Sequence, residues 1–244
     1  MNKSYFSDII YFGKRKSDPE SGMKYGLIIS WFFLLNSIIL LTACNKGFKD
    51  SEGNQYKVVK IGSQVWMAEN LNVGHFRNGD PIPEVQGIRE WESAGLEGKP
   101  ACCYFENKTE NGKKYGKLYN WYAVIDQRGF VPEGWHLPDG NEWAELIRNL
   151  GGESVAADKL KTIYGWNMGC NGTNSSGFSG LPGGYRHYSG GFNKYDPTGG
   201  AYWWGSSEGF IYITCSYPVY QSTGGENRSF TSKARGFSVR LIRD

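Results

Sequence analysis

One cysteine near the start of the chain lies in a context that supports covalent lipid attachment. Cys44 follows Leu41, Thr42 and Ala43, and together these four residues form a lipobox, the cleavage motif of exported lipoproteins. In that chemistry a diacylglyceryl group is added to the thiol, the signal peptidase cuts before the cysteine, and the new amino terminus receives an acyl chain such as palmitate. Each methylene of an acyl chain that enters the bilayer contributes about 0.8 kcal/mol of binding free energy, so several acyl chains anchor a protein stably where a single myristoyl chain does not. We therefore predict that Cys44 anchors the protein to a membrane.

The residues before this cysteine have the layout of an export signal. Lys24 supplies a positive charge, and residues 27–41 form the apolar stretch that follows it. We predict that translation starts at Met23, that residues 23–43 are a lipoprotein signal peptide, and that residues 1–22 are an extension outside the functional protein.

A transmembrane helix over residues 27–43 is the alternative. It would be at the short limit of the roughly 17–25 residues that a span requires, and polar residues interrupt it. The cysteine directly after Thr-Ala favours the lipoprotein. The predicted location is the cell envelope, with the protein lipid-anchored to a bacterial membrane, the outer membrane by preference.

Four further cysteines could form disulfides, which an exported protein permits: Cys102, Cys103, Cys170 and Cys215. Neighbours in a strand point to opposite faces, so a bond between Cys102 and Cys103 is the least favourable pairing. Two alternatives stay open: buried unpaired thiols, or one bridge from Cys170 or Cys215 to a member of the adjacent pair. Cysteines at this spacing, with three histidines, form no zinc pattern, so neither a metal nor a cofactor is predicted.

Motifs for catalysis are missing from the sequence. It contains no Gly-x-Ser-x-Gly elbow, no phosphate-binding loop and no His-Glu-x-x-His helix. His136 lies between Trp135 and Leu137, where a histidine more often has a structural role than acts as a base. From residue 44 onward the net charge is about +1, which argues against electrostatic capture of nucleic acid. We predict a protein that is not an enzyme and has no nucleic-acid partner.

The strongest helix signal lies near the middle of the chain. Asp139 and Glu142 form an Asp-x-x-Glu capping box, which predicts a helix that begins near Gly140 and ends at Gly151 and Gly152. Its apolar residues recur at three- and four-residue spacing and form one stripe: Trp143, Leu146, Ile147 and Leu150. A second helix of about two turns is predicted over residues 118–125.

Strand-like runs surround these helices. Two runs, at residues 55–61 and 64–71, are joined at Gly62 and Ser63 and predict an opening hairpin. Turns are predicted at residues 78–83 and 107–114, and further strands at residues 101–106, 201–207, 210–216 and 236–242. The last strand alternates, with Phe237, Val239 and Leu241 expected in the core and Ser238, Arg240 and Ile242 expected to be partly exposed.

Residues 165–200 are predicted to form a long ordered loop. They are rich in Gly, Ser and Asn but also carry the aromatic residues that disordered segments lack. Aromatic residues make up 16% of the chain and glycines number 34, which favours many loops fixed by large side chains and a low helix content.

Several segments together resemble one known family. YGKLYNWYAV, PEGWHLPDGNEWAEL, the upstream DSEGNQYKVVKIGSQVWMAENLN and the closing GFSVRLIRD are similar to the Fibrobacter succinogenes major paralogous domain family, found on bacterial cell surfaces. The resemblance covers residues 50–244. WHLPDGNEW and GFSVRLI also resemble, more loosely, the formylglycine-generating enzyme and C-type-lectin-like group.

This resemblance implies an α+β, C-type-lectin-like fold. In such a fold two short helices pack on a twisted, largely antiparallel sheet, long irregular loops rich in Gly and aromatic residues lie above it, and a C-terminal strand runs beside the N-terminal hairpin. The domain would occupy residues 53–244, after a lipidated tether at residues 44–52. The activities of the looser relatives do not transfer: only Cys215 lies where a catalytic cysteine pair is expected, and the Glu-Pro-Asn and Trp-Asn-Asp segments of calcium-dependent sugar sites are missing.

The predicted function is a surface-displayed binding or adhesion module for a glycan or protein ligand. Tyr and Trp provide large rigid contact area at low entropic cost, as they do in antibody paratopes. The candidate ligand-binding residues are Tyr185, Arg186, Tyr188, Tyr202, Trp203, Trp204, Tyr212, Tyr217, Tyr220 and Asn227. At least one of Trp203 and Trp204 is expected in the core, because adjacent strand residues face opposite ways. The alternative is a structural or assembly component of the envelope with no separate ligand.

Some lectin-like surface proteins vary their C-terminal loop residues through diversity-generating retroelements. That possibility requires one shared exposed face for six residues: Tyr212, Thr214, Tyr217, Tyr220, Ser222 and Asn227. An ordinary exposed strand-and-turn region is the alternative, and the composition favours it.

Overall fold

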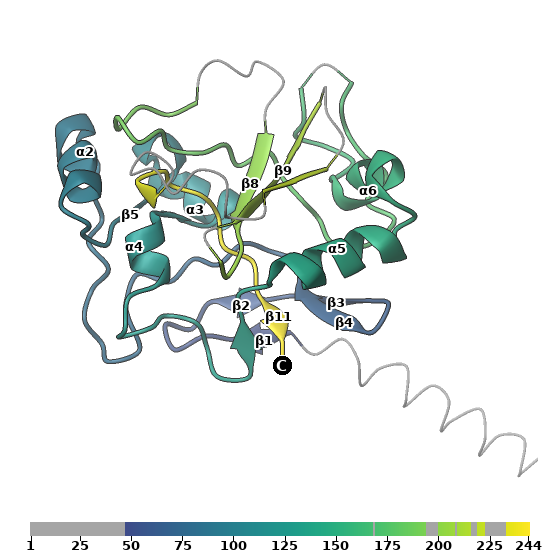
Figure 1. Cartoon of the computed structure of the whole chain (residues 1–244), viewed down its shortest axis with the longest axis horizontal. Coiled ribbons are helices and arrows are strands. Elements are labelled where there is room, and N and C mark those ends of the chain that lie inside the picture. The colour runs from purple at the N-terminus through teal and green to yellow at the C-terminus, as the bar shows by residue number, and fades with distance from the viewer. Residues whose placement is uncertain (1–46, 168, 194–199, 208, 216–218, 223–232) are drawn as a thin grey trace, which may run out of the picture. The chain divides into compact units, whose positions relative to one another are not determined.

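Four small antiparallel sheets and five short α-helices make up the part of the chain that the computed structural model describes (Figure 1). The described residues are 47–167, 169–193, 200–207, 209–215, 219–222 and 233–244. The predicted signal peptide at residues 23–43, Cys44, Tyr217 and Asn227 lie outside them. Among the described helices, none is long and apolar enough to cross a bilayer.

The largest sheet joins the two ends of the domain. Its strands are β3 (Val58–Ile61), β4 (Gln64–Met67), β11 (Ile242–Arg243) and β7 (Trp135–His136), in the order β3-β4-β11-β7. The predicted hairpin is confirmed: Ile61 pairs with Gln64, and the turn between them uses Gly62 at φ 62°. The expected neighbour relation is confirmed too, because Ile242 of the C-terminal strand pairs with Trp66 of β4.

A second sheet holds the C-terminal strands β8 (Gly200–Trp204), β9 (Phe210–Thr214) and β10 (Tyr220–Ser222), in the order β10-β9-β8. Two short strand pairs complete the set. They are β1 (Phe48–Lys49) with β2 (Gln55–Tyr56), and β5 (Cys102–Cys103) with β6 (Leu118–Tyr119). Between α6 (Glu153–Leu160) and β8, residues 161–167 and 169–193 form only isolated bridges, in agreement with the predicted long loop.

Helix α5 (Gly140–Asn149) confirms the strongest sequence signal. The Asp139 side chain accepts from the backbone N–H of Glu142 at 2.9 Å, and Glu142 Oε2 accepts from the Asp139 N–H at 2.8 Å, so the capping box is complete. The predicted stripe of Trp143, Leu146, Ile147 and Leu150 is buried. After the helix, the Gly152 N–H bonds the Ile147 carbonyl at 3.0 Å with φ 92°, a conformation that glycine adopts without strain.

The other helices differ from prediction. Residues 118–125 do not form a two-turn helix: Leu118 and Tyr119 are strand β6, and α4 (Trp121–Val124) is a single turn capped by the Asn120 side chain. Three helices were not predicted: α2 (Ile88–Leu96), α3 (Gly112–Tyr115) and α6 (Glu153–Leu160). Neither α2 nor α6 has a side-chain cap, and α3 replaces the last three residues of the predicted turn at residues 107–114. The expected pair of helices is therefore wrong in number.

Two strand predictions also need correction. Of residues 101–106 only Cys102–Cys103 form a strand, and a 3₁₀ turn at Phe105–Asn107 follows. The predicted strand at residues 236–242 is regular only where β11 begins at Ile242. Ser238, Arg240 and Ile242 are buried rather than partly exposed, because the segment is covered on both sides. Its carbonyls accept from Met67, Leu71 and Trp204 in two neighbouring segments.

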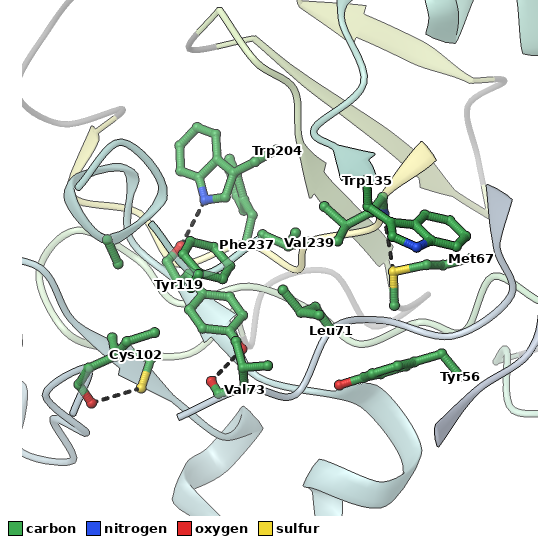
Figure 2. Packing of buried hydrophobic residues seen from close by; sticks show 14 of the residues in the cluster. Tyr56, Met67, Leu71, Val73, Cys102, Tyr119, Trp135, Trp204, Phe237 and Val239 are labelled. Carbon is green, nitrogen blue, oxygen red and sulfur yellow. Dashed lines mark hydrogen bonds between the residues drawn. The ribbon is translucent and has the colours of Figure 1, made fainter. Parts of the chain in front are cut away.

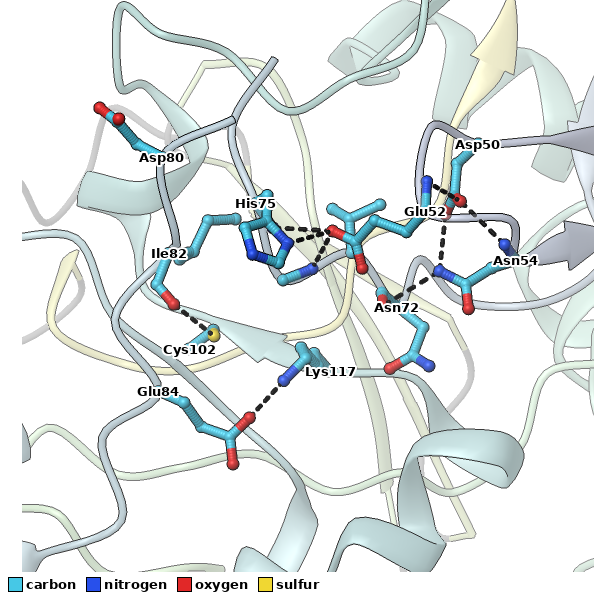
Figure 3. A network of polar contacts seen from close by, with 12 residues as sticks. Asp50, Glu52, Asn54, Asn72, His75, Asp80, Ile82, Glu84, Cys102 and Lys117 are labelled. Atoms are coloured by element: carbon cyan, nitrogen blue, oxygen red, sulfur yellow. Dashed lines mark hydrogen bonds and ion pairs between the residues drawn. The ribbon is translucent and has the colours of Figure 1, made fainter. Parts of the chain in front are cut away.

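The second half of the expected tether is folded. Phe48 and Lys49 pair with Tyr56 and Gln55, and Asp50 is buried, with its carboxylate accepting from the Tyr56 hydroxyl at 2.8 Å. Glu52 reaches the next loop, where its Oε1 accepts from the backbone N–H groups of Gly74 at 2.6 Å and His75 at 2.8 Å (Figure 3). The folded domain thus begins at Phe48 or earlier, because these polar contacts fix residues that a flexible tether would leave free.

Buried aromatic residues divide between two main clusters. In the first, Tyr119 donates its hydroxyl to the Val73 carbonyl at 2.7 Å and accepts on its own carbonyl the Trp204 indole N–H at 2.7 Å, among aliphatic and aromatic neighbours (Figure 2). The second cluster lies between α5 and the C-terminal sheet and includes Trp66, Trp143, Phe178, Trp203, Ile211 and Ile213. The two clusters pack the largest sheet, the C-terminal sheet and α5 against one another.

One disulfide forms, between Cys170 in the long loop and Cys215 after β9. Cys102 and Cys103 are unpaired and buried in different clusters, so they do face apart. Neither predicted alternative is correct as a whole: two thiols are free as the first supposed, but the bridge joins Cys170 to Cys215 and leaves out the adjacent pair. Burial raises the pKa of Cys102 to about 12 and that of Cys103 to about 11, so neither is a reactive thiolate at neutral pH.

Candidate functional site

Three tyrosines form a row across the C-terminal sheet. Tyr202 of β8 pairs directly with Tyr212 of β9, which in turn pairs with Tyr220 of β10. Their ring centroids are 5.4 Å apart for the first pair and 4.9 Å for the second. Opposed residues of neighbouring strands lie close enough for such rings to stack. We call these three residues the tyrosine row.

The opposite face of the same sheet explains why the tyrosines point away from the second cluster. Trp203, Ile211 and Ile213 alternate with the tyrosines along β8 and β9, and all three are at most 1% exposed. A slip of one residue in the pairing would move these apolar side chains out of the core. Burial of the apolar face therefore sets the register that aligns the tyrosines.

The row is partly open to solvent and firmly supported. Tyr220 is 47% exposed, whereas Tyr202 and Tyr212 are partly buried. Tyr185 from the long loop packs edge-on against Tyr202 at 4.7 Å, and Phe237 stacks beneath Tyr202 at 5.6 Å. Tyr220 on β10 is thus the exposed end of the row, and Tyr202 at the other end packs against the first core cluster.

A second feature surrounds His136, at a cavity of about 710 Å³. His136 Nδ1 lies 2.6 Å from Asp244 Oδ1, and its Nε2 lies 2.8 Å from Glu142 Oε1. Partial burial lowers the pKa of His136, but the hydrogen bonds and charges of the two carboxylates outweigh this effect, so the pKa is raised above its usual 6.5. The His136 side chain therefore connects Glu142 in the first turn of α5 to Asp244. With both nitrogens held by carboxylates, the ring acts as a clamp.

Comparison with protein-family models gives a match over most of the domain. Residues 59–243, from β3 to β11, match the model of the Fibrobacter succinogenes major domain. The chain belongs to this family. Comparison with curated proteins gives no match, and comparison with solved structures gives none either.

In this Fibrobacter succinogenes major domain the two predicted tryptophans are core residues. Trp203 and Trp204 are each 1% exposed, and their indole N–H groups donate to Asn70 Oδ1 at 2.8 Å and to the Tyr119 carbonyl at 2.7 Å. The expectation that at least one lies in the core is confirmed. Their candidacy as ligand contacts is wrong, because the sheet is covered over both residues.

Arg186 is also misplaced among the ligand candidates. It is fully buried, and its guanidinium donates to the backbone carbonyls of Gly190, Val85, Gln86 and Gly87 and to Asn107 Oδ1. It also lies over the Trp91 ring at 4.5 Å. Arg186 therefore ties the long loop to the start of α2.

The remaining candidates divide into three groups. Tyr185 packs against Tyr202 of the tyrosine row. Tyr188 is partly buried and instead contacts the His187 ring, with the ring centroids 4.0 Å apart. Tyr217 and Asn227 lie outside the described residues. The strand register puts Thr214 on the same face as Tyr212, but Thr214 is buried, so the condition of one exposed face for the diversified set fails there.

Sequence reasoning did not find the clamp. His136 and Glu142 are six residues apart in WHLPDGNEW, and this local pair could have suggested it. Asp244 is separated from His136 by 108 positions, and only the pairing of β7 with β11 brings it near.

Proposed function

We propose that this chain is a cell-surface lipoprotein, anchored through Cys44, that acts as a non-catalytic binding or adhesion module. Its ligand, a glycan or protein of the surroundings, would contact the tyrosine row. The observation that carries the proposal is the in-register alignment of Tyr202, Tyr212 and Tyr220 on the one face of this sheet that is not covered by the second cluster.

The physical argument rests on the kind of surface that these rings make. A tyrosine combines a large apolar ring with a polar hydroxyl and has few rotamers, so it loses little entropy when a ligand binds. Strand pairing and contact with Tyr185 and Phe237 hold the row before any ligand arrives. Such preorganisation reduces the entropic cost of association.

We further propose that the domain is a variant of the C-type-lectin-like fold. Two features support this: the C-terminal strand β11 pairs with β4 of the N-terminal hairpin, and residues 161–167 and 169–193 form a long loop with only isolated bridges. The lectin-like fold supplies the scaffold in this proposal and carries no calcium-dependent sugar site.

A screen with matched variants tests the binding function. The full-length protein in detergent micelles is applied to a glycan array and to immobilised surface extracts, beside the double variant Tyr212→Ser/Tyr220→Ser. Leu96→Ser is the control, because Leu96 is 66% exposed at the end of α2 and lines neither the tyrosine row nor a cavity described for this chain. We expect a ligand whose capture falls at least tenfold in the double variant and is unchanged in the control.

The other outcomes have distinct meanings. Capture of an envelope protein that is equally strong in the double variant would favour the assembly role instead. The binding proposal is overturned if the screen finds no ligand whose capture depends on the tyrosine row. Lipidation has its own test: Cys44→Ser should release the protein from the membrane fraction, and retention after an alkaline wash would favour a transmembrane anchor.

A further inference from the structure

A cavity of about 360 Å³ lies where the segment after β4, helix α3, the long loop and the C-terminal segment meet. Its lining is strongly basic. Four cationic side chains, Lys57, Lys113, Lys114 and Arg240, line it together with a single carboxylate, Glu69. The three lysines are exposed, whereas Arg240 is 1% exposed. Positive charge therefore extends from the solvent side of the cavity to a buried guanidinium.

Arg240 lacks a full set of protein acceptors. Its Nε and Nη2 donate to Asn70 Oδ1 at 3.1 and 2.8 Å, and Nη1 donates to the Phe178 carbonyl. Three of its five N–H groups are thus used. Asn70 Oδ1 also accepts the Trp203 indole N–H at 2.8 Å, so this single oxygen serves three donors. Among the described residues, no carboxylate forms an ion pair with Arg240.

The other buried arginine shows what a purely structural guanidinium looks like in this protein. Arg186 makes five hydrogen bonds, to four backbone carbonyls and one side-chain amide, which matches its five N–H groups. Arg240 is equally buried but has fewer acceptors, and it borders a cavity. The Arg240 guanidinium lies over the Phe178 ring at 4.1 Å and the Trp203 ring at 5.4 Å, but it has no ion-pair partner among the described residues. A buried charge without such a partner is costly, and burial lowers the pKa of Arg240 to about 9 despite the opposing charge of Glu69.

The lysines on the solvent side also have no counter-ions within the described chain. No ion pair forms at Lys57, Lys113 or Lys114, although Lys114 lies over the Tyr115 ring at 4.7 Å. Glu69 accepts a bond from the Lys57 backbone N–H at 2.6 Å, which leaves the Lys57 ammonium outside that contact. Guanidinium and ammonium groups that converge on one cavity are the donors that recognise carboxylate, sulfate and phosphate.

We propose that this cavity is an anion-binding site for a small carboxylate, sulfate or phosphate ligand, with Arg240 as its buried donor and Lys113 and Lys114 as its solvent-side charges. The volume is within the range of small-molecule sites. Glu69 weakens binding by its like charge. This inference is independent of the tyrosine row. Arg240 contacts Phe178 and Trp203 of the second cluster, and the tyrosine row lies on the other face of the C-terminal sheet.

The test uses the full-length protein in detergent micelles. Sodium sulfate, sodium phosphate and sodium galacturonate are titrated separately at constant ionic strength, with sodium chloride as the reference. Melting temperature and the side-chain Nε–H resonance of Arg240 are recorded. We expect saturable stabilisation by at least one of the three anions, together with a saturable shift of the Arg240 resonance.

Three variants decide the assignment. Lys113→Gln/Lys114→Gln should weaken the binding constant about tenfold, and Glu69→Gln should tighten it several-fold. The control Lys60→Gln/Arg148→Gln removes the same charge from exposed positions that do not line the cavity, and it should leave the binding constant unchanged. Circular dichroism confirms that each variant is folded. The proposal is overturned if no anion gives saturable stabilisation beyond chloride, or if the control weakens binding as much as the cavity variant.

Discussion

Replacement of Trp143 tests how α5 is packed. The side chain is 2% exposed, and its ring lies 4.6 Å from Trp66, 6.2 Å from Phe178 and 6.4 Å from Trp203. Removal of a buried aromatic side chain leaves a cavity that rigid aromatic neighbours fill poorly. We therefore expect Trp143→Ala to lower the free energy of unfolding by about 3–5 kcal/mol.

Trp143 has a second property that separates packing from hydrogen bonding. Its buried indole N–H has no acceptor among the residues that the structure describes, and an unpartnered buried donor costs about 1–3 kcal/mol. Trp143→Phe removes this donor and keeps most of the aromatic contact. The phenylalanine variant should therefore lose about 2 kcal/mol or less, because the relief of the unpartnered N–H offsets part of the lost contact area.

Urea unfolding followed by far-ultraviolet circular dichroism measures both variants in the full-length protein, without relying on tryptophan fluorescence. The dependence on urea should keep the wild-type slope, since the surface exposed on unfolding changes little. A loss below about 1 kcal/mol for Trp143→Ala would show that this face of α5 is not packed as described. Equal losses for the two variants would show that the indole N–H has a partner.

Three further predictions concern the His136 clamp, the disulfide between Cys170 and Cys215, and the buried Arg186. Because the carboxylates raise the pKa of His136 in the folded state, its stabilisation is complete below the unfolded value near 6.5 and is lost as pH rises through the folded pKa. As pH rises through this range, the free energy of unfolding of the wild type should fall relative to that of His136→Gln by on the order of 1 kcal/mol or less, since His136 and its two carboxylate partners are partly exposed. If the two proteins have parallel profiles of stability against pH, the clamp is contradicted. Cys170→Ser/Cys215→Ser should lower the free energy of unfolding by about 2–4 kcal/mol, and dithiothreitol should then have no further effect on that variant. Arg186→Met should cost on the order of 3 kcal/mol or more in urea unfolding, because it leaves buried carbonyls without donors, and wild-type stability would refute this role.

The parts of the fold that could be predicted are those with local signals. The α5 capping box needs only Asp139 and Glu142, and the opening hairpin needs only an alternating pattern on each side of Gly62. Helices α2 and α6 follow Gly87 and Gly152, with no side-chain cap to mark where they begin. Their stability comes from tertiary packing, which overrides weak local preference.

The candidate site was predictable in composition but not in geometry. Alternation in the β9 sequence FIYIT already separates Tyr212 from Ile211 and Ile213. The alignment of Tyr202 and Tyr220 with it depends on the lengths of two connections, which no local pattern specifies. The burial of Arg186 was not predictable for a related reason, because three of its five acceptors lie about 100 positions earlier in the chain.

The two faces of the C-terminal sheet have different freedom to change. Trp203, Ile211 and Ile213 fix the register through the second cluster, so large-to-small changes there would each cost several kcal/mol. Tyr212 and Tyr220 retain solvent contact, and their side chains could be replaced without opening a cavity in that cluster. Thr214 is buried on the tyrosine face, which limits this freedom toward the end of β9 nearest the disulfide. If the tyrosine row binds a ligand as proposed, changes at its exposed end would alter the ligand while the strand register stays constant, because separate side chains control the two properties.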